Sequence, residues 1–364
     1  MLRTRRLSRR WRRTCTRAHC RLSHAPTLGR VVRRPIAQHG ARMALQAPFS
    51  WTSSAPILAP LAREGDVAIS VKDPTLVEHD GRWHMFCSVR SRTRTHQIEH
   101  ISSDRLDDWT GADRALLTCA DGYFCAPQVF FFRPHGLWYL VYQTHAEGRR
   151  LGLQPAYSTS RDISDPSSWT APTLFYSDDS LPTVERWIDF WVICDDTRAH
   201  LFFTSLDGRM WRAETGLGEF PSGFGDAACV ISEARDDWRL FEASHTYRVA
   251  EDGTYITLVE GEDRRDGVRR YFMAYAADSL AGEWSPVAAT PTAPFAGRAN
   301  VAFEGDRWSD HISHGELVRQ NADETLTISA ADMRMVYQGV RHEDYAGARY
   351  GDIPWRVGML TLDG

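Results

Sequence analysis

The chain has 364 residues, of which 43% are hydrophobic and 11% aromatic, and its formal net charge is −4. Residues 1–42 contain 13 arginines and no lysine or acidic residue, so residues 43–364 carry a net charge of −17. This acidic body argues against a nucleic-acid partner, and no segment is apolar and long enough to span a membrane.

The arginine-rich start, residues 1–42, is the first feature along the chain. It has no apolar stretch of secretory length, and the paired arginines in SRRWRR lack the apolar region that follows them in an export signal. We interpret it as a disordered extension, or as sequence upstream of a true start at Met43. A targeting segment and a nucleic-acid-binding arm are the alternatives.

The seven cysteines show no Cys-x-x-Cys pair and no zinc-type spacing, and they leave the redox compartment open. Cys119 and Cys125 are close enough in sequence to form a disulfide in an exported protein. Cys87 and Cys194 lie inside apolar runs, which predicts buried thiols.

After residue 50 the sequence is typical of short strands separated by Gly, Asn and Asp-Gly turns. Five segments share an apolar strand, a polar turn and a second, aromatic strand, and they start at Asp73, Ala126, Ile188, Phe241 and Ile312. Three of these segments are followed by a further strand, a Ser/Asp-rich turn and a tryptophan. Two hairpins per unit, repeated five times, predict an all-β fold, a five-bladed β-propeller over residues 49–364. An irregular sandwich with chance similarity is the alternative.

The first strand of each propeller blade lines the central channel. Near the start of the five first strands stand Asp73, Gln128, Asp189, Glu242 and His314, and we expect these side chains to face one cavity. This placement would explain why Asp189 stands among aromatic residues in RWIDFWVICDD. An unpaired carboxylate buried among such residues would be costly, whereas one that faces a channel would not be.

Three acids on three inner strands supply the parts needed to hydrolyse a glycosidic bond. One ionised carboxylate activates water, and one protonated carboxyl donates its proton to the leaving oxygen. A third negative charge nearby raises the pKa of the donor, because like charges resist simultaneous ionisation. Channel acids also bind metals or are simply solvated, so the spacing alone leaves these alternatives open.

Several longer blocks of sequence carry a resemblance to a known family. They are VKDPTLV, GYFCAPQVFFF, PAYSTSRDISDPSSWTAP, RWIDFWVICDD, LFEASHTY, PFAGRANVAF and ISHGELVR. From about Phe49 to Leu362 the chain resembles glycoside hydrolase family 62, α-L-arabinofuranosidases that remove arabinose from arabinoxylan. The resemblance implies a secreted, monomeric enzyme that inverts the anomeric centre, although no clear secretion signal is visible. Family 43, with the same architecture, is the more distant relative.

The resemblance assigns a role to each acid by position. It implies that Asp73 is the general base, Glu242 the general acid, and Asp189 the residue that raises the pKa of the donor and orients it. Their structural alternatives are a turn residue, a solvated edge carboxylate and an acceptor between blades, respectively. Glu316 and Glu185 are nearby acids that rank below Glu242 as proton donors.

The resemblance also implies contacts with the sugar and a metal. The expected substrate-binding residues are Lys72, Gln128, Ile188, Tyr350 and Arg356, although strand alternation could turn Lys72 outward. His314, with Gln128, is expected to hold a structural calcium ion ligated otherwise by water. Imidazole is an unusual calcium ligand, and a hydrogen-bonded channel histidine is the alternative.

The sequence therefore predicts an arabinofuranosidase acting on arabinoxylan and its oligosaccharides. A family 43-like β-xylosidase or arabinanase is one alternative. A non-catalytic sugar-binding propeller is another, although such a protein would be expected to lack one of the three acids. No phosphate loop, dinucleotide fingerprint or nucleophile elbow supports a kinase, an oxidoreductase or a serine hydrolase.

Overall fold

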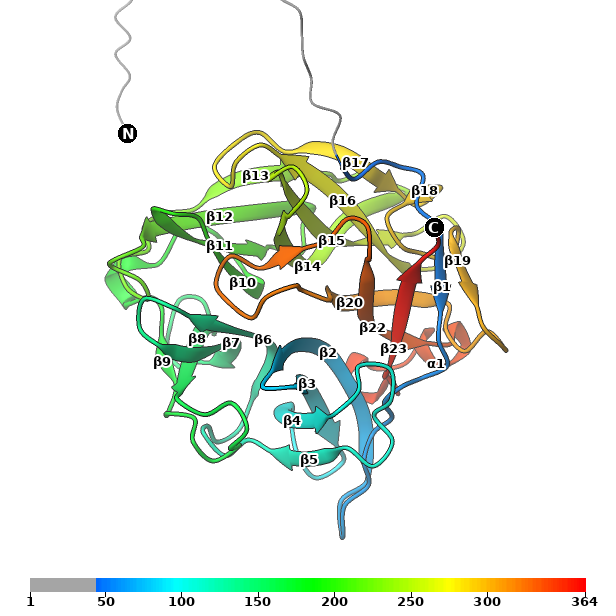
Figure 1. Cartoon of the computed structure of the whole chain (residues 1–364), viewed down its shortest axis with the longest axis horizontal. Coiled ribbons are helices and arrows are strands. Elements are labelled where there is room, and N and C mark those ends of the chain that lie inside the picture. Colours follow the sequence, from blue (N-terminus) through cyan, green and yellow to red (C-terminus); the bar gives the residue numbers. More distant parts are fainter. Residues whose placement is uncertain (1–43) are drawn as a thin grey trace, which may run out of the picture. The chain divides into compact units, whose positions relative to one another are not determined.

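The computed structural model describes residues 44–364, which form five β-sheets placed around a common centre as the blades of a propeller (Figure 1). The five-bladed fold predicted from the repeat is confirmed. The expectation for residues 1–42 lies outside the described residues. Within the described part, no helix is long and apolar enough to cross a membrane.

The first three blades are four-stranded antiparallel sheets in chain order. Blade I contains β2 (Ala68–His79), β3 (Arg82–Ser91), β4 (Gln97–Ser103) and β5 (Asp113–Leu116). Blade II contains β6 (Phe124–Phe132), β7 (Leu137–His145), β8 (Leu153–Ser160) and β9 (Thr173–Leu174). Blade III contains β10 (Ile188–Cys194), β11 (Arg198–Thr204), β12 (Arg209–Gly216) and β13 (Ala228–Ser232).

The last two blades carry extra strands. Blade IV contains β14 (Trp238–Val249), β15 (Tyr255–Asp263), β16 (Arg269–Ala277) and β17 (Ser285–Thr290), with β18 (Ala293–Pro294) and β21 (Thr327–Ile328) at its two edges. Blade V runs outward from β20 (His311–Leu317) through β22 (Arg334–Val340), β23 (Arg356–Leu362) and β1 (Trp51–Ser53) to β19 (Val301–Phe303). One short α-helix, α1 (His342–Tyr345), and two 3-10 turns, η1 (Asp178–Ser180) and η2 (Tyr350–Asp352), complete the elements.

Strand β1 closes the ring, because it joins the two ends of the described chain within blade V. It pairs antiparallel with β23, where Trp51 faces Leu362, and parallel with β19, where Trp51 faces Val301. The Trp51 side chain is fully buried, and its indole N–H donates to the carbonyl of Phe295 at 2.6 Å.

We expect Trp51→Ala to lower the free energy of unfolding by about 3–5 kcal/mol, the range for truncating a large buried aromatic residue. Thr52→Ala, in the same strand, is the matched control, because its hydroxyl bonds to Asp363 in an exposed position. Its expected cost is below about 1 kcal/mol. Denaturant unfolding measures both, and equal losses would show that closure by Trp51 does not stabilise the ring.

Packing between blades accounts for the aromatic content. The Trp187 ring lies 5.3 Å from that of Tyr176, which follows the last strand of blade II, and packs edge-on against Phe190 and Phe203 of blade III at 5.2 and 5.6 Å. Cys87 and Cys194 are buried as expected. Cys119 and Cys125 are both free, so the disulfide considered for them does not form in this structure.

The inner strand of each blade contains a β-bulge. The pairing register shifts between Lys72 and Thr75 in β2, and similar shifts interrupt β6, β10, β14 and β20. Four residues at these bulges have positive φ, namely Asp73 (51°), Ala126 (53°), Asp189 (55°) and Ala243 (53°). A bulge re-aims a side chain out of the normal alternation, and non-glycine residues adopt positive φ at a cost of about 1–3 kcal/mol.

The bulges correct the sequence-based ring of five channel residues. The bulge position in blade II is Ala126, and Gln128 lies two residues farther along β6. There its amide oxygen accepts the N–H of Val192 at 2.7 Å, and its amide nitrogen donates to the carbonyl of the same residue at 2.6 Å. Gln128 is fully buried and ties blade II to blade III. These two bonds use one N–H and one lone pair of its amide, and Gln128 as a sugar or metal ligand stays a prediction.

Candidate active site

Asp73 lies at the bulge of β2 and is only 2% exposed. Its carboxylate accepts a hydrogen bond from the Lys72 ammonium at 2.8 Å, and Nδ1 of His314 is 3.5 Å from its other oxygen. The Asp73 N–H donates to the side-chain oxygen of Gln338 at 2.8 Å. Lys72 therefore points inward, and Asp73 is not a solvated turn residue.

The environment of Asp73 favours its ionised form. Burial acts to raise its pKa, but the charges of Lys72 and His314 and the hydrogen bonds from Lys72 and Ser88 outweigh burial and lower the pKa to about 2. Asp73 is thus a carboxylate at neutral pH, which is the state that a general base requires.

Asp189 occupies the same bulge position in β10. Its Oδ2 accepts the backbone N–H of Ala243 at 3.0 Å and lies 3.8 Å from Nδ1 of His314. Burial raises the pKa of Asp189, the charge of Asp73 adds to this effect, and the charge of His314 opposes it. Since Ala243 directly follows Glu242, Asp189 holds the backbone beside that glutamate.

Glu242 stands one residue before the bulge of β14 and is 6% exposed. Burial raises its pKa well above the usual range, and the charges of Glu260 and Asp189 add to this, against the opposing charge of Arg270. The closest atom of Arg270 is 3.7 Å from the Glu242 carboxyl. Glu242 therefore keeps a proton at pH values at which Asp73 has lost its own.

These contacts bring together the three acids predicted from the sequence. One imidazole nitrogen, Nδ1 of His314, lies within 3.5 Å of Asp73 and 3.8 Å of Asp189. Asp189 in turn contacts the residue next to Glu242. Blades I, III, IV and V thus each contribute to one cluster whose acids differ in protonation.

The remaining residues predicted to bind substrate lie at different places relative to the cluster. The Tyr350 ring lies 5.2 Å from the Lys72 ammonium and is 45% exposed, so it stands at the rim of the cluster in η2. Ile188 is partly exposed and directly precedes Asp189. Arg356 instead packs over the Trp308 ring at 5.3 Å, on a strand two positions outward from β20. The structure does not bring Arg356 to the carboxylates.

The side chains present supply few donors for calcium. Among residues 44–364, no group of three or more His, Cys, Asp and Glu side chains is placed to hold a metal ion. His314 offers a single imidazole, whereas calcium prefers six to eight oxygen ligands. Calcium bound to His314 therefore stays a prediction.

Sequence analysis missed Arg270 and Glu260, which lie on the third and second strands of blade IV. Arg270 is 3.7 Å from Glu242 and 2.9 Å from Glu260, and Glu260 accepts hydrogen bonds from the hydroxyl of Ser313 and the N–H of His314. Both are buried. The sequence contains one indication of this pair, which is that Glu260 lies inside the apolar run YITLVEGED. That run is equally typical of a strand that ends in a charged turn.

Two buried carboxyls with oppositely shifted pKa values on the inner strands of a propeller are the parts that glycoside hydrolysis requires, and comparison with known proteins identifies the family. The family model for glycosyl hydrolase family 62 matches residues 50–361. The chain belongs to this family, which confirms the resemblance seen in the sequence.

Individual relatives support this assignment. The chain is 33% identical over 324 residues to α-L-arabinofuranosidase C of Cellvibrio japonicus, and the match covers 87% of this chain and 48% of that protein. The chain thus spans about half the length of this curated relative. The catalytic domain of the Coprinopsis cinerea family 62 α-L-arabinofuranosidase superposes with a TM-score of 0.78 at 38% identity, covering 87% of this chain and 98% of that one. A Podospora anserina α-L-arabinofuranosidase in complex with cellotriose gives 0.79 at 36% identity, covering 88% and 99%.

Proposed function

We propose that the protein is an α-L-arabinofuranosidase that releases arabinose side groups from arabinoxylan and its oligosaccharides with inversion at the anomeric carbon. The observation that carries this proposal is that Asp73 and Glu242 are buried in one cluster whose surroundings lower the pKa of the first and raise that of the second. The names of the relatives supply the arabinofuranosidase activity.

In the proposed reaction each of two acids takes one step. Asp73, held ionised by Lys72, removes a proton from a water molecule as that water attacks the anomeric carbon. Glu242 gives its proton to the xylan oxygen as the bond to arabinose breaks, so the atoms of water are divided between the two products. The positive charge that develops on the sugar ring is stabilised by the nearby carboxylates.

The test is to incubate the full chain with arabinoxylan and to follow the products by NMR at early times. The proposal predicts free arabinose, first in the anomeric form opposite to that of the linkage. Xylobiose and debranched arabinan serve as comparison substrates. Xylose from xylobiose, or faster cleavage of arabinan, would favour the family 43-like alternatives, and no product from any substrate would favour a sugar-binding propeller.

Asp189→Asn should move the alkaline limb of the pH profile of kcat/KM to lower pH. Its negative charge helps to raise the pKa of Glu242. Without that charge the pKa of Glu242 falls, so Glu242 loses its proton, and the enzyme its activity, at a lower pH. Glu304→Gln, an exposed acid in blade V, should leave the limb in place. An unchanged limb in Asp189→Asn, or a move to higher pH, would exclude this role for Asp189.

A further inference from the structure

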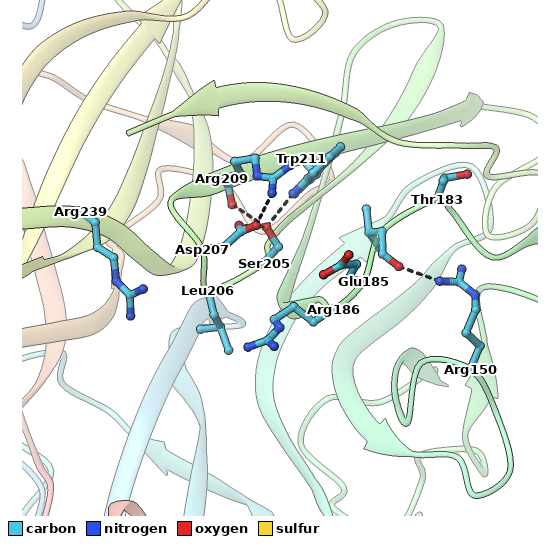
Figure 2. Close-up of a pocket in the computed structure, with 11 residues that line it drawn as sticks. Arg150, Thr183, Glu185, Arg186, Ser205, Leu206, Asp207, Arg209, Trp211 and Arg239 are labelled. Atoms are coloured by element: carbon cyan, nitrogen blue, oxygen red, sulfur yellow. Dashed lines mark hydrogen bonds and ion pairs between the residues drawn. The ribbon is translucent and has the colours of Figure 1, made fainter. Parts of the chain in front are cut away.

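A hollow of about 1070 Å³ is lined by residues of blades II and III and by the start of blade IV (Figure 2). Its lining includes the guanidinium groups of Arg186, Arg209 and Arg239, the Trp211 ring and Leu206. In Figure 2 the Arg186 side chain extends toward Leu206. None of these residues belongs to the catalytic cluster.

The hollow adjoins the cluster along two inner strands. Arg186 precedes Asp189 by three residues, and Arg239 precedes Glu242 by three. Since a strand rises about 3.3 Å per residue, each backbone distance is about 10 Å at most. A polysaccharide with one side group at Glu242 can therefore present a neighbouring group to the hollow.

The hollow is lined by four arginines, namely Arg150 and the three named above, against two carboxylates, those of Glu185 and Asp207. Arg209 pairs with Asp207 at 2.6 Å, but Arg239 shares the carboxylate of Glu262 with Arg264, at 2.8 and 2.6 Å. Arg186 is exposed and makes no hydrogen bond or ion pair within the part of the chain that the structure describes. Residues 43–364 carry a net charge of −17, so this local excess of arginine runs against the charge of the whole body.

The loop that carries Arg186 is held in place before any ligand binds. Arg150 donates to the carbonyls of Pro182 and Val184, both at 2.6 Å. The N–H of Thr183 donates to Asp226 at 2.7 Å. A guanidinium on a fixed loop loses less conformational entropy on binding than one on a mobile loop.

We propose that this hollow binds a uronic-acid side group carried by the same polysaccharide as the arabinose. A guanidinium matches the planar geometry of a carboxylate with two parallel hydrogen bonds. Trp211, whose indole N–H is fixed by Ser205 at 2.8 Å, supplies an apolar wall for a sugar ring. The strongly acidic body repels long polyanions, which favours a single carboxylate on a neutral chain. This inference rests on the proposed function for the identity of the polymer.

The kinetic test compares an arabinoxylan that bears uronic-acid groups with one that does not. Arg186→Gln should lower kcat/KM about three- to fivefold on the acidic polymer, the range for an exposed ion pair, and leave the neutral polymer unchanged. The loss should shrink as salt is added. Arg161→Gln, an exposed arginine following β8 at the opposite ends of the strands, is the matched control. Equal losses on both polymers, or no loss on either, would overturn the proposal.

A binding test separates this inference from the proposed function. The full-length Glu242→Gln variant is titrated calorimetrically with xylo-oligosaccharides that carry a uronic acid but no arabinose, with their neutral counterparts, and with free glucuronate. We expect tighter binding of the acidic oligosaccharide than of the other two, and loss of this preference when Arg186→Gln is added. Equal binding of acidic and neutral oligosaccharides would refute the uronate site, even if arabinose release succeeds. Preferential binding without arabinose release would refute the proposed function and retain the site.

Discussion

Glu242→Gln should lower kcat on arabinoxylan by about 10² to 10⁴, the usual contribution of a general acid. Glutamine keeps the shape of the side chain but has no acidic proton to give to the xylan oxygen. Because Glu242 is buried and carries a raised pKa, its neutral replacement should cost little stability, and the variant should unfold at nearly the wild-type temperature.

The leaving group sharpens this prediction. In an aryl arabinofuranoside made from an acidic phenol, the phenolate leaves without being protonated. Glu242→Gln should therefore lose much less activity on that substrate than on arabinoxylan. Glu304→Gln is the control and should match the wild type on both substrates. A Glu242→Gln variant that retains activity on arabinoxylan, or that loses it equally on both substrates, would show that Glu242 is not the proton donor.

Asp73→Asn should also lower kcat by about 10² to 10⁴, but by the same factor on both substrates. Water activation is needed whatever the leaving group is, and an amide at this position cannot take the proton from water. Comparison of the two variants on the two substrates therefore assigns base and acid separately.

Stability needs checking in Asp73→Asn, because the change leaves the Lys72 ammonium buried without its partner at 2.8 Å. Removal of one member of a buried ion pair costs about 3–5 kcal/mol. Activity is therefore measured well below the melting temperature of the variant. Asp80→Asn, in the exposed turn after β2, is the control for both stability and rate. Near wild-type activity in folded Asp73→Asn would remove Asp73 from the role of base.

The sequence predicted the blades and the three acids well, because both follow from patterns that lie along the chain. The alternation of strands and turns repeats five times, and Asp73, Asp189 and Glu242 each lie in the inner strand of a blade. An acid placed among aromatic residues, as in WIDFW, already indicated a special environment.

The sequence did not predict the register of the inner strands. A bulge adds one residue to a strand. Alanine, the residue at positions 126 and 243, does not indicate from its type that the backbone has a positive φ there. Gln128 was therefore placed with the carboxylates, whereas it bonds to the neighbouring blade. Arg270 and Glu260 were missed for a related reason. Their meeting depends on the register between the second and third strands of blade IV, in which Glu262 faces Arg270 and Glu260 faces Phe272. Charged residues in strands usually face solvent, so the sequence does not indicate that these two are buried.

The central claim is that Glu242 keeps its proton at pH values at which Asp73 is ionised. Carbon-13 NMR of protein labelled at the side-chain carboxyls of Asp and Glu measures this directly, with resonances assigned by comparison with Asp73→Asn and Glu242→Gln. The account predicts a Glu242 signal that titrates well above the usual range of a glutamate and an Asp73 signal that stays ionised down to about pH 3. A Glu242 signal that is already ionised at pH 5 would contradict it.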